Sequence, residues 1–266
     1  MPVNTIPENI LKTLKFIPVE NICFHEKYNH RHIENIRSSL EVDGVLKNPP
    51  LALYIDDGKY LILDGAHRTS ALKELGCKNI LAQVVSTENL DSLKVETWYH
   101  LVPLGDWIQR LKESLKLEFG NESEDRQSIA KLYFSKNKQE NIYGDKKGIS
   151  LKKKIELWNL VVESYSKNYE VQRLKSLNNL NLQNDNMVVV SFPKVDINFM
   201  KTVGLENFLL PPGVTRCILS GRILNLNIPI ELLKKAEPLD RDWDMLISRW
   251  SNGLRFYEEP VFIQEL

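Results

Sequence analysis

The sequence predicts an α+β fold, with an N-terminal domain over residues 1–94 and a C-terminal α/β domain over residues 95–266. Three observations favour this prediction. Short segments typical of strands and helices follow one another closely through the first hundred residues. A polar stretch, STENLDS at 86–92, then interrupts this pattern. At 266 residues, the chain is long enough to form two separate hydrophobic cores.

The expected N-terminal domain is a small mixed sheet packed against helices. Ile33, Ile36 and Leu40 lie at helical spacing on one face of a segment that ends at a glycine. The sequence DDG that follows the apolar run PLALYI is a strong hairpin signal. The expected elements, in order, are a strand or extended arm over 14–24, a helix over 31–44, strands over 50–55 and 59–63, a helix over 67–76 and a strand over 79–85.

The character of the sequence changes in the expected C-terminal domain. The tryptophans and leucines of 95–120 favour a mostly helical segment, and the polar composition of 121–154 favours loops around a short helix. The remaining expected elements are a helix over 152–167, an irregular stretch over 174–186, a strand over 187–192, a strand, turn, strand and helix start over 211–233, a helix over 242–254 and a closing strand over 260–266.

Composition and charge narrow the class of protein. Lys+Arg and Asp+Glu both number 35, so the net charge does not indicate a polyanionic partner. No apolar run approaches the roughly 20 residues that span a bilayer, and the first residues lack the pattern of a secretory signal. The three cysteines lie far apart and form no CxxC pair, which is typical of reduced thiols. We therefore expect a cytoplasmic protein.

The most informative stretch is LILDGAHRTSALKELG at 61–76, where a strand ends at Asp64-Gly65 and a helix begins. The first backbone N–H groups of a helix are unpaired, and together with the helix dipole they favour an anion. Gly65 allows a ligand to approach the backbone, and Arg68 can bind a phosphate through two hydrogen bonds. Asp64 suits a Mg²⁺ ion carried by that phosphate. In an alternative reading, Asp64 caps the helix and Arg68 is simply solvated.

Several motifs of the first hundred residues resemble the ParB/sulfiredoxin fold. They are FHE at 24–26, NPPLAL at 48–53 and the strand and helix over 60–76. The signature loop of that fold binds nucleotide phosphates at the start of a helix. Sulfiredoxins have a catalytic cysteine where this chain has Ala66, so the resemblance does not imply sulfinic-acid repair. Gly65 and Arg68 match the Gly-x-x-Arg box of ParB proteins, but no helix-turn-helix pattern follows.

A second resemblance covers almost the whole chain. The motifs FHE, DGAHR, TWYHLVPLGDW at 97–107, PPGVTR at 211–216 and SGRILNLNIPIELL at 220–233 resemble those of the free L-serine kinases built on this fold. That family includes archaeal ADP-dependent members and an ATP-using member from staphyloferrin B siderophore clusters. The resemblance implies phosphorylation of free L-serine to O-phospho-L-serine by ATP or ADP with Mg²⁺, as a precursor for siderophore or amino-acid biosynthesis.

The same resemblance implies roles for the residues of the first domain. Glu26 matches the catalytic glutamate of the family and would accept the proton of the serine hydroxyl, although the residue alone reads as an ordinary exposed glutamate. Asp64 would take part in catalysis by orienting Mg²⁺ against the terminal phosphates. The nucleotide would be bound by Gly65, His67, Arg68, Thr69 and Ser70.

A free amino acid has to be held by its carboxylate and ammonium groups. Thr215 and Arg216 of PPGVTR offer a hydroxyl and a guanidinium for the carboxylate, while Trp98 and His100 of TWYH offer a packing wall and a polar contact. Trp98 could instead fill the core, and Arg222 could be a further substrate contact or a structural ion-pair partner. These residues imply a cleft between a nucleotide-binding first domain and a serine-binding second domain.

Two other classes of function compete with a kinase. A ParB-like, nucleotide-dependent DNA-binding regulator needs a basic surface and a recognition helix, and the neutral charge weighs against both. A nucleotide hydrolase or nuclease does not need the motifs GVTR and TWYH, because neither activity requires a carboxylate clamp. The expected partners are therefore L-serine and an adenine nucleotide, with DNA not favoured and no membrane.

Overall fold

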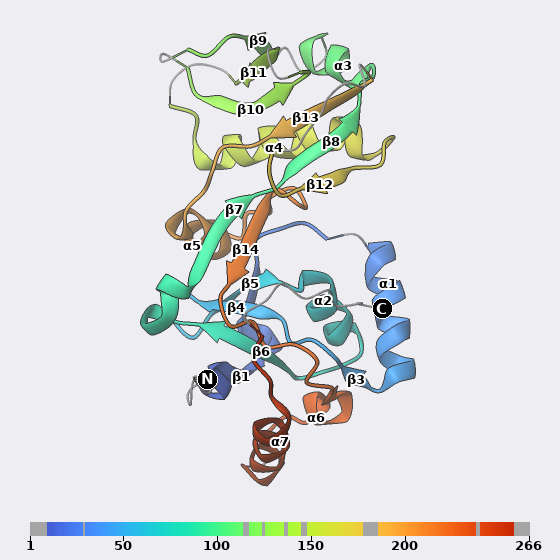
Figure 1. Cartoon of the computed structure of the whole chain (residues 1–266), viewed down its shortest axis with the longest axis vertical. Helices are drawn as coiled ribbons and strands as arrows, with labels where there is room; N and C mark the ends of the chain where they lie inside the picture. The colour runs from blue at the N-terminus through green and yellow to red at the C-terminus, as the bar shows by residue number, and fades with distance from the viewer. Residues whose placement is uncertain are drawn as a thin grey trace. The chain divides into compact units, whose positions relative to one another are not determined.

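The computed structural model describes residues 10–28, 30–113, 117–123, 126–135, 138–144, 148–177, 186–237 and 240–257 (Figure 1). The chain divides into two compact units. Unit 1 consists of Met1–Cys23, Tyr28–Leu93 and Leu219–Leu266, and unit 2 consists of Phe24–Lys27 and Lys94–Ile218.

Unit 1 is built on a five-stranded mixed sheet with the strand order β1-β6-β4-β5-β2. β4 runs parallel to β6 and antiparallel to β5, while β1 is antiparallel to β6. All seven residues of β6 are buried, as expected for a strand inside a covered sheet. The strands are β1 (Leu14–Pro18), β2 (Ile22–Phe24), β4 (Leu51–Tyr54), β5 (Tyr60–Asp64) and β6 (Asn79–Val85), with a separate antiparallel pair of β3 (Val45–Leu46) and β15 (Ile228–Pro229).

The hairpin between β4 and β5 follows from its turn residues. Asp57 has φ 49° and Gly58 has φ 74°, and two successive residues with positive φ are the requirement of a type I′ turn. The backbone N–H of Ile55 donates to the carbonyl of Lys59 across this turn. The predicted hairpin is confirmed.

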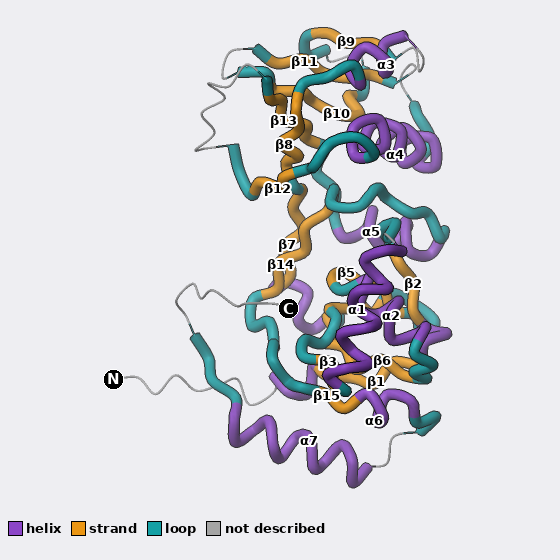
Figure 2. Tube along the Cα trace, turned by 90° about the vertical axis from the view of Figure 1, so that its right-hand side faces the viewer, coloured by secondary structure: helices purple, strands orange, loops and turns teal. Residues whose placement is uncertain are grey.

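The helices of unit 1 pack around this sheet. α1 packs against α2, and the two lie side by side in Figures 1 and 2. Both lie at their predicted places, because α1 has the apolar spacing of a half-buried helix and both helices end before a glycine with positive φ. The helices are α1 (His30–Asp43), α2 (Ala66–Glu74), α6 (Ile230–Lys234) and α7 (Asp240–Gly253), with 3₁₀ turns at Ile10–Thr13, Val19–Asn21 and Thr87–Ser92.

The last part of the chain differs from the predicted division into domains, because residues 219–266 return to unit 1 instead of staying with residues 95–218. Leu233 and Trp250 are buried in the same hydrophobic cluster as Leu72 and Ile80. The carbonyl of Leu233 also accepts a hydrogen bond from the backbone of Lys78. Burial of apolar side chains from 223–250 against the first sheet therefore determines where this segment folds.

Unit 2 contains a six-stranded sheet with the order β12-β8-β13-β10-β11-β9. All its strand pairs are antiparallel, so the expected α/β arrangement of this part is not confirmed. Its elements are β8 (Tyr99–Pro103), α3 (Trp107–Glu113), β9 (Glu118–Gly120), β10 (Ser128–Tyr133), β11 (Gln139–Tyr143), α4 (Leu151–Ser166), β12 (Gln172–Leu174), β13 (Met187–Ser191) and α5 (Ile197–Leu205), together with the two-stranded sheet of β7 (Leu93–Thr97) and β14 (Thr215–Leu219).

The prediction of a mostly helical 95–120 is wrong, since this segment contains β7, β8, the short helix α3 and β9. Burial in β8 alternates, with His100 and Val102 buried and their neighbours partly exposed, which is the period of a strand. The loops expected over 121–154 are likewise replaced in part by β10 and β11. The predicted helix over 152–167 and strand over 187–192 are confirmed as α4 and β13.

The expected closing strand over 260–266 and most of the irregular stretch over 174–186 lie outside the described residues. Among the residues that are described, no helix has both the length and the apolar character needed to cross a bilayer.

The burial of α7 predicts that unit 1 depends on this helix for its stability. Trp250 is 5% exposed and its indole N–H donates to the carbonyl of Leu226, whereas Met245 in the same helix is 64% exposed. We expect Trp250→Ala to destabilise the protein by about 3–5 kcal/mol, which lowers the Tm by roughly 6 °C or more, and Met245→Ala to leave it nearly unchanged. Circular dichroism melts measure both; equal Tm values for the two variants would contradict the placement of α7 in the core.

Candidate functional site

A pocket of about 580 Å³ in unit 1 lies at the joint between β5 and α2. This volume is within the range of roughly 300–1,000 Å³ that is typical of small-molecule sites. One part of its wall is apolar and comes from α1 and β3, including Ile36, Leu40 and Val45. Asp64 and Arg68 provide a charged part. The pocket thus combines a surface for a flat apolar group with a surface for an ionic group.

The backbone at the joint requires glycine. Gly65 has φ 89°, and a Cβ atom there would lie 3.1 Å from Nη2 of Arg68 and 3.2 Å from Cβ of Pro50. Gly65 is the N-cap of α2 and no side chain caps this helix, so the alternative in which Asp64 caps it is wrong. The start of α2 lies at the pocket, and the N-terminus of a helix favours an anion.

Two arginines meet at Asp64. Its Oδ2 atom accepts hydrogen bonds from Nη2 of Arg68 at 3.0 Å and from Nη2 of Arg222 at 3.2 Å. Arg68 also donates to the carbonyl of Asn48, and Arg222 donates to Oε1 of Gln83. Both arginine side chains are about one-fifth exposed, so neither is simply solvated. Two guanidinium groups against one carboxylate leave an excess of positive charge beside the N-terminus of α2, which favours an anion.

Arg222 is the residue whose place the sequence left open. It belongs to unit 1 as an ion-pair partner of Asp64, whereas Glu26 belongs to unit 2. The motif SGR marked it as a candidate, but the carboxylate that it would meet lies 158 positions earlier in the chain. Such a partner cannot be found from local spacing.

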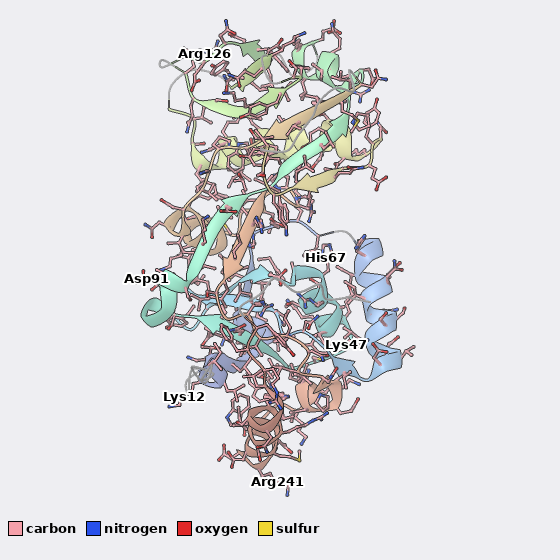
Figure 3. The ribbon with its side chains drawn as sticks, viewed as in Figure 1. Lys12, Lys47, His67, Asp91, Arg126 and Arg241 are labelled. Carbon is pink, nitrogen blue, oxygen red and sulfur yellow. The ribbon has the colours of Figure 1, made fainter. Side chains whose placement is uncertain are left out.

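His67 and Asn48 complete the polar part of the pocket. Figure 3 labels His67 at the start of α2 and Lys47 beside β3. The ring of His67 lies 5.6 Å from that of His32, and Lys47 forms an ion pair with Asp43 of α1. Asn225 was not predicted; its backbone N–H donates to Oδ1 of Asn48 at 2.8 Å. The run LNLN is a turn signal, but nothing in it indicates that this turn meets residue 48.

Thr69 and Ser70 do not line the pocket, although the resemblance assigned them to the nucleotide. They are 0% and 7% exposed, and their hydroxyl groups have no hydrogen-bond partner among the described residues. They share the buried side of α2 with Ala71 and Leu72. Ala66, His67 and Arg68 at the start of α2 are partly exposed, whereas Thr69 and Ser70 are buried, so the latter two support the packing of α2 rather than its open end.

Glu26 lies in unit 2, where residues 210–215 hold it. It forms a parallel bridge with Leu210, whose N–H donates to the carbonyl of His25 at 2.7 Å. Oε1 of Glu26 accepts from the hydroxyl of Thr215 at 2.5 Å, and Oε2 accepts from the N–H of Gly213 at 3.3 Å. The carboxylate is one-fifth exposed. Glu26 is therefore a positioned group and not an ordinary surface glutamate.

The proton positions around Glu26 follow from donor counting. Thr215 has one hydroxyl hydrogen and donates it to Glu26, so Nε2 of His25 must donate to the Thr215 oxygen at 2.9 Å. Burial alone would raise the pKa of Glu26. The hydrogen bond and charge of His25, with the hydrogen bonds from Thr215 and Gly213, lower this pKa below its usual 4.5. The carboxylate is ionised at neutral pH and can accept a proton.

His100 is placed differently from the expectation that it contacts the substrate. It is 1% exposed, and both ring nitrogens are engaged inside unit 2. Nε2 donates to the carbonyl of Gly213 at 2.7 Å, so Nδ1 must accept from the hydroxyl of Tyr165 at 2.7 Å. Because the N–H of Gly213 donates to Glu26, Gly213 links the buried His100 to the candidate site.

Thr215 and Arg216 do not form the expected clamp. Neighbouring side chains of a strand point to opposite faces, and the hydroxyl of Thr215 is committed to Glu26. Arg216 instead donates to Glu96 at 3.2 Å, and its guanidinium lies 4.8 Å from the ring centroid of Trp98. Trp98 is partly exposed, so it does not simply fill the core.

No cluster of three or more His, Cys, Asp or Glu side chains in the described parts of the chain could hold a metal ion. The described residues offer an ionised carboxylate in unit 2 and a helix start suited to an anion in unit 1. The first suits removal of a proton from a hydroxyl, and the second suits a polyphosphate.

The burial of His100 predicts a loss of stability in acid. Burial lowers the pKa of His100 from 6.5 to about 4, while its bond to Gly213 opposes this shift. The unfolded chain binds this proton more readily, so the contribution of His100 is complete above pH 6.5 and is lost as the pH falls towards 4. Between pH 7 and 4.5, we expect the Tm of the wild type to fall further than that of His100→Gln. Differential scanning fluorimetry measures both, and an equal fall in Tm for the two proteins would contradict this role of His100.

No family model matches the chain. The ATP-dependent L-serine kinase SbnI of Staphylococcus aureus is 29% identical over 259 residues, which cover 97% of this chain and 99% of that protein. The ADP-dependent L-serine kinase SerK of Thermococcus kodakarensis is 28% identical over 143 residues, which cover 51% of this chain and 59% of that protein.

Two solved structures extend these similarities. SbnI of S. aureus with a C-terminal truncation has a TM-score of 0.81 at 28% identity, covering 91% of this chain and 99% of that one. A variant free serine kinase in complex with ADP has a TM-score of 0.69 at 21% identity, covering 83% of this chain and 93% of that one, and shares the fold. The resemblance seen in the motifs is confirmed, and the chain is a homologue of the free L-serine kinases.

Proposed function

We propose that this protein transfers a phosphoryl group from ATP or ADP to the hydroxyl of free L-serine and releases O-phospho-L-serine. The observation that supports this most directly is the carboxylate of Glu26, which is ionised and held by Thr215 and Gly213. It lies in the FHE motif of a chain that matches an ATP-dependent L-serine kinase over 97% of its length.

Glu26 acts as the general base in this proposal. A serine hydroxyl is a weak nucleophile, and a carboxylate within hydrogen-bond reach can accept its proton as the oxygen attacks phosphorus. Thr215, Gly213 and His25 fix the carboxylate before the substrate arrives. Positioning of this kind provides a large share of the rate acceleration in phosphoryl transfer.

Unit 1 binds the nucleotide in this proposal. The adenine would lie against the apolar wall that includes Ile36 and Leu40, and the phosphates would lie at the start of α2 beside His67 and Arg68. The guanidinium of Arg68 has its own partners in Asp64 and Asn48, so it presents a fixed positive charge to the phosphates. Unit 2 would then bind the serine.

The residues fit a Mg²⁺ ion that is carried by the nucleotide. The pocket has one exposed carboxylate at the joint, Asp64, and both arginines donate to its Oδ2 atom. Mg²⁺ usually binds one or two protein carboxylates and completes its coordination with phosphate oxygens and water. When bound, the ion would neutralise phosphate charge and leave the proton transfer to Glu26.

ATP is the donor that we favour. The relative that matches nearly the whole chain is named an ATP-dependent enzyme, whereas the match to the ADP-dependent enzyme covers about half of the chain. The resemblance seen in the sequence motifs further implies that the product, O-phospho-L-serine, is a precursor in siderophore or amino-acid biosynthesis, and we propose a cytoplasmic enzyme.

The decisive experiment is incubation of the purified chain with L-serine, Mg²⁺ and either ATP or ADP, followed by mass detection of phosphoserine. We expect Glu26→Gln to lower kcat by about 10²-fold or more, with nucleotide affinity within twofold of the wild type. Glu170→Gln, an exposed glutamate in unit 2, is the matched control and keeps full activity. Folded wild-type protein that makes no phosphoserine with either nucleotide would refute the proposed function.

The hydrogen bond from Thr215 predicts a change in the pH profile. It lowers the pKa of Glu26, so its removal in Thr215→Val raises this pKa. The base is then protonated at a higher pH, and the acidic limb of the kcat/KM profile moves to higher pH. Thr215→Ser keeps a hydroxyl and should retain the wild-type limb. A Thr215→Val profile that is lower at every pH but not displaced would indicate a purely structural role for this hydroxyl.

A further inference from the structure

Arg173 lies against the peptide that holds Glu26. In the register of β12 and β8, Arg173 is opposite His100, in adjacent strands of unit 2 that Figure 1 also shows. A Cβ atom on Gly213 would lie 2.4 Å from Nε of Arg173 and 2.6 Å from its Cζ. Gly213 also has φ 77°. The guanidinium therefore packs directly over Gly213, and a side chain at position 213 would have to displace it.

This contact places a positive charge close to the catalytic carboxylate. The N–H of Gly213 donates to Oε2 of Glu26, so one peptide lies between the guanidinium and the base. The charges of Arg173 and Glu26 also act in opposite directions on the pKa of the buried His100, which shows that both lie within electrostatic range of the same ring.

The guanidinium of Arg173 has no ion pair or hydrogen bond within the described parts of the chain, and the residue is exposed. The other basic side chains on the segments around Glu26 are engaged. Lys27 forms an ion pair with Glu163 at 3.0 Å. Arg216 binds Glu96 and covers the ring of Trp98. Of Lys27, Arg173 and Arg216, Arg173 is the one whose charge is available to a ligand.

We propose that Arg173 binds the carboxylate of the amino-acid substrate and so determines that the acceptor is an α-amino acid. This inference rests on the proposed function and deepens it. Only two carbon atoms separate the hydroxyl oxygen of serine from its carboxylate carbon. A cation that binds this carboxylate must therefore lie near the base that faces the hydroxyl, and a guanidinium matches a carboxylate with two parallel hydrogen bonds.

Arg173 replaces the pair that the sequence suggested for this task. The hydroxyl of Thr215 serves Glu26, and Arg216 lies on the opposite face of its strand. Arg173 has no motif of its own, and 40 positions separate it from Gly213. Only the pairing of β12 with β8 brings it to the site.

The test compares L-serine with L-serinamide, in which the carboxylate is replaced by a neutral amide. Steady-state rates are measured on the full chain with the nucleotide that supports turnover by the wild type. We expect Arg173→Ala to raise the KM for L-serine at least tenfold, because hydrogen bonds between charged groups are the strong ones. The KM for the nucleotide and the kcat/KM for L-serinamide should stay within twofold of the wild type.

Two further variants sharpen this comparison. Arg173→Lys keeps the charge but not the paired donors, and should recover part of the affinity for L-serine. Lys175→Ala removes an exposed cation two residues along the chain and should leave the KM for L-serine unchanged. Circular dichroism and nucleotide affinity show whether each variant is folded. If Arg173→Ala is not folded, Arg173→Gln replaces it, because glutamine is closer to arginine in length.

Three results would overturn the inference while leaving the proposed function intact. The first is an unchanged KM for L-serine in Arg173→Ala. The second is a KM for the nucleotide that rises as much as the KM for L-serine. The third is an equal loss of kcat/KM with L-serine and with L-serinamide. The second would assign Arg173 to the phosphates, and the third to packing alone. A wild-type protein that forms no phosphoserine overturns the proposed function itself, which distinguishes the two failures.

Discussion

The hydrogen bonds that residues 213–215 donate to Glu26 are the interaction on which the candidate site depends. A carboxylate that is four-fifths covered loses much of its hydration, and it stays ionised only because protein donors replace the water. These donors come from a segment 187–189 positions later in the chain. The parallel bridge to Leu210 and the bond from His100 to Gly213 keep that segment in register. Glu26 and the segment 210–215 therefore form one cooperative hydrogen-bonded structure.

The same stretch of chain also contributes to the candidate anion site of unit 1. A few residues after Thr215, Arg222 reaches Asp64 and Asn225 reaches Asn48. Asp64 thus serves as the anchor of two guanidinium groups, which explains how a carboxylate can belong in a site for an anion. It orders the positive charge and offers only its remaining oxygen to a cation. Both sites are finished by side chains and peptides from the region of PPGVTR and SGRILNLN, the two motifs that carried the resemblance in this half of the chain.

Local patterns predicted much of unit 1 because each of its elements has strong local signals. The DDG turn, the spacing in α1 and the glycine before α2 each act through neighbouring residues. The prediction failed over 95–120, where Trp98 and Trp107 suggested one helix. The alternating burial of β8 appears only once its neighbours β12 and β13 are in place, and pairing between strands outweighs the helix preference of the segment.

By itself, the sequence determined which chemical groups the candidate site contains. They are an acid in FHE, a glycine and an arginine after β5, and motifs similar to those of the free serine kinases. These are properties of adjacent residues, and short-range geometry is enough to reveal them. Only the tertiary structure decided which groups meet. In the folded chain, Arg222 pairs with Asp64, and Thr69 and Ser70 are buried. His100 is buried and donates to the carbonyl of Gly213, and Arg173 packs against Gly213, whose N–H binds Glu26. Each of these depends on contacts between residues far apart in the chain, which form only when strands pair and apolar surface is buried.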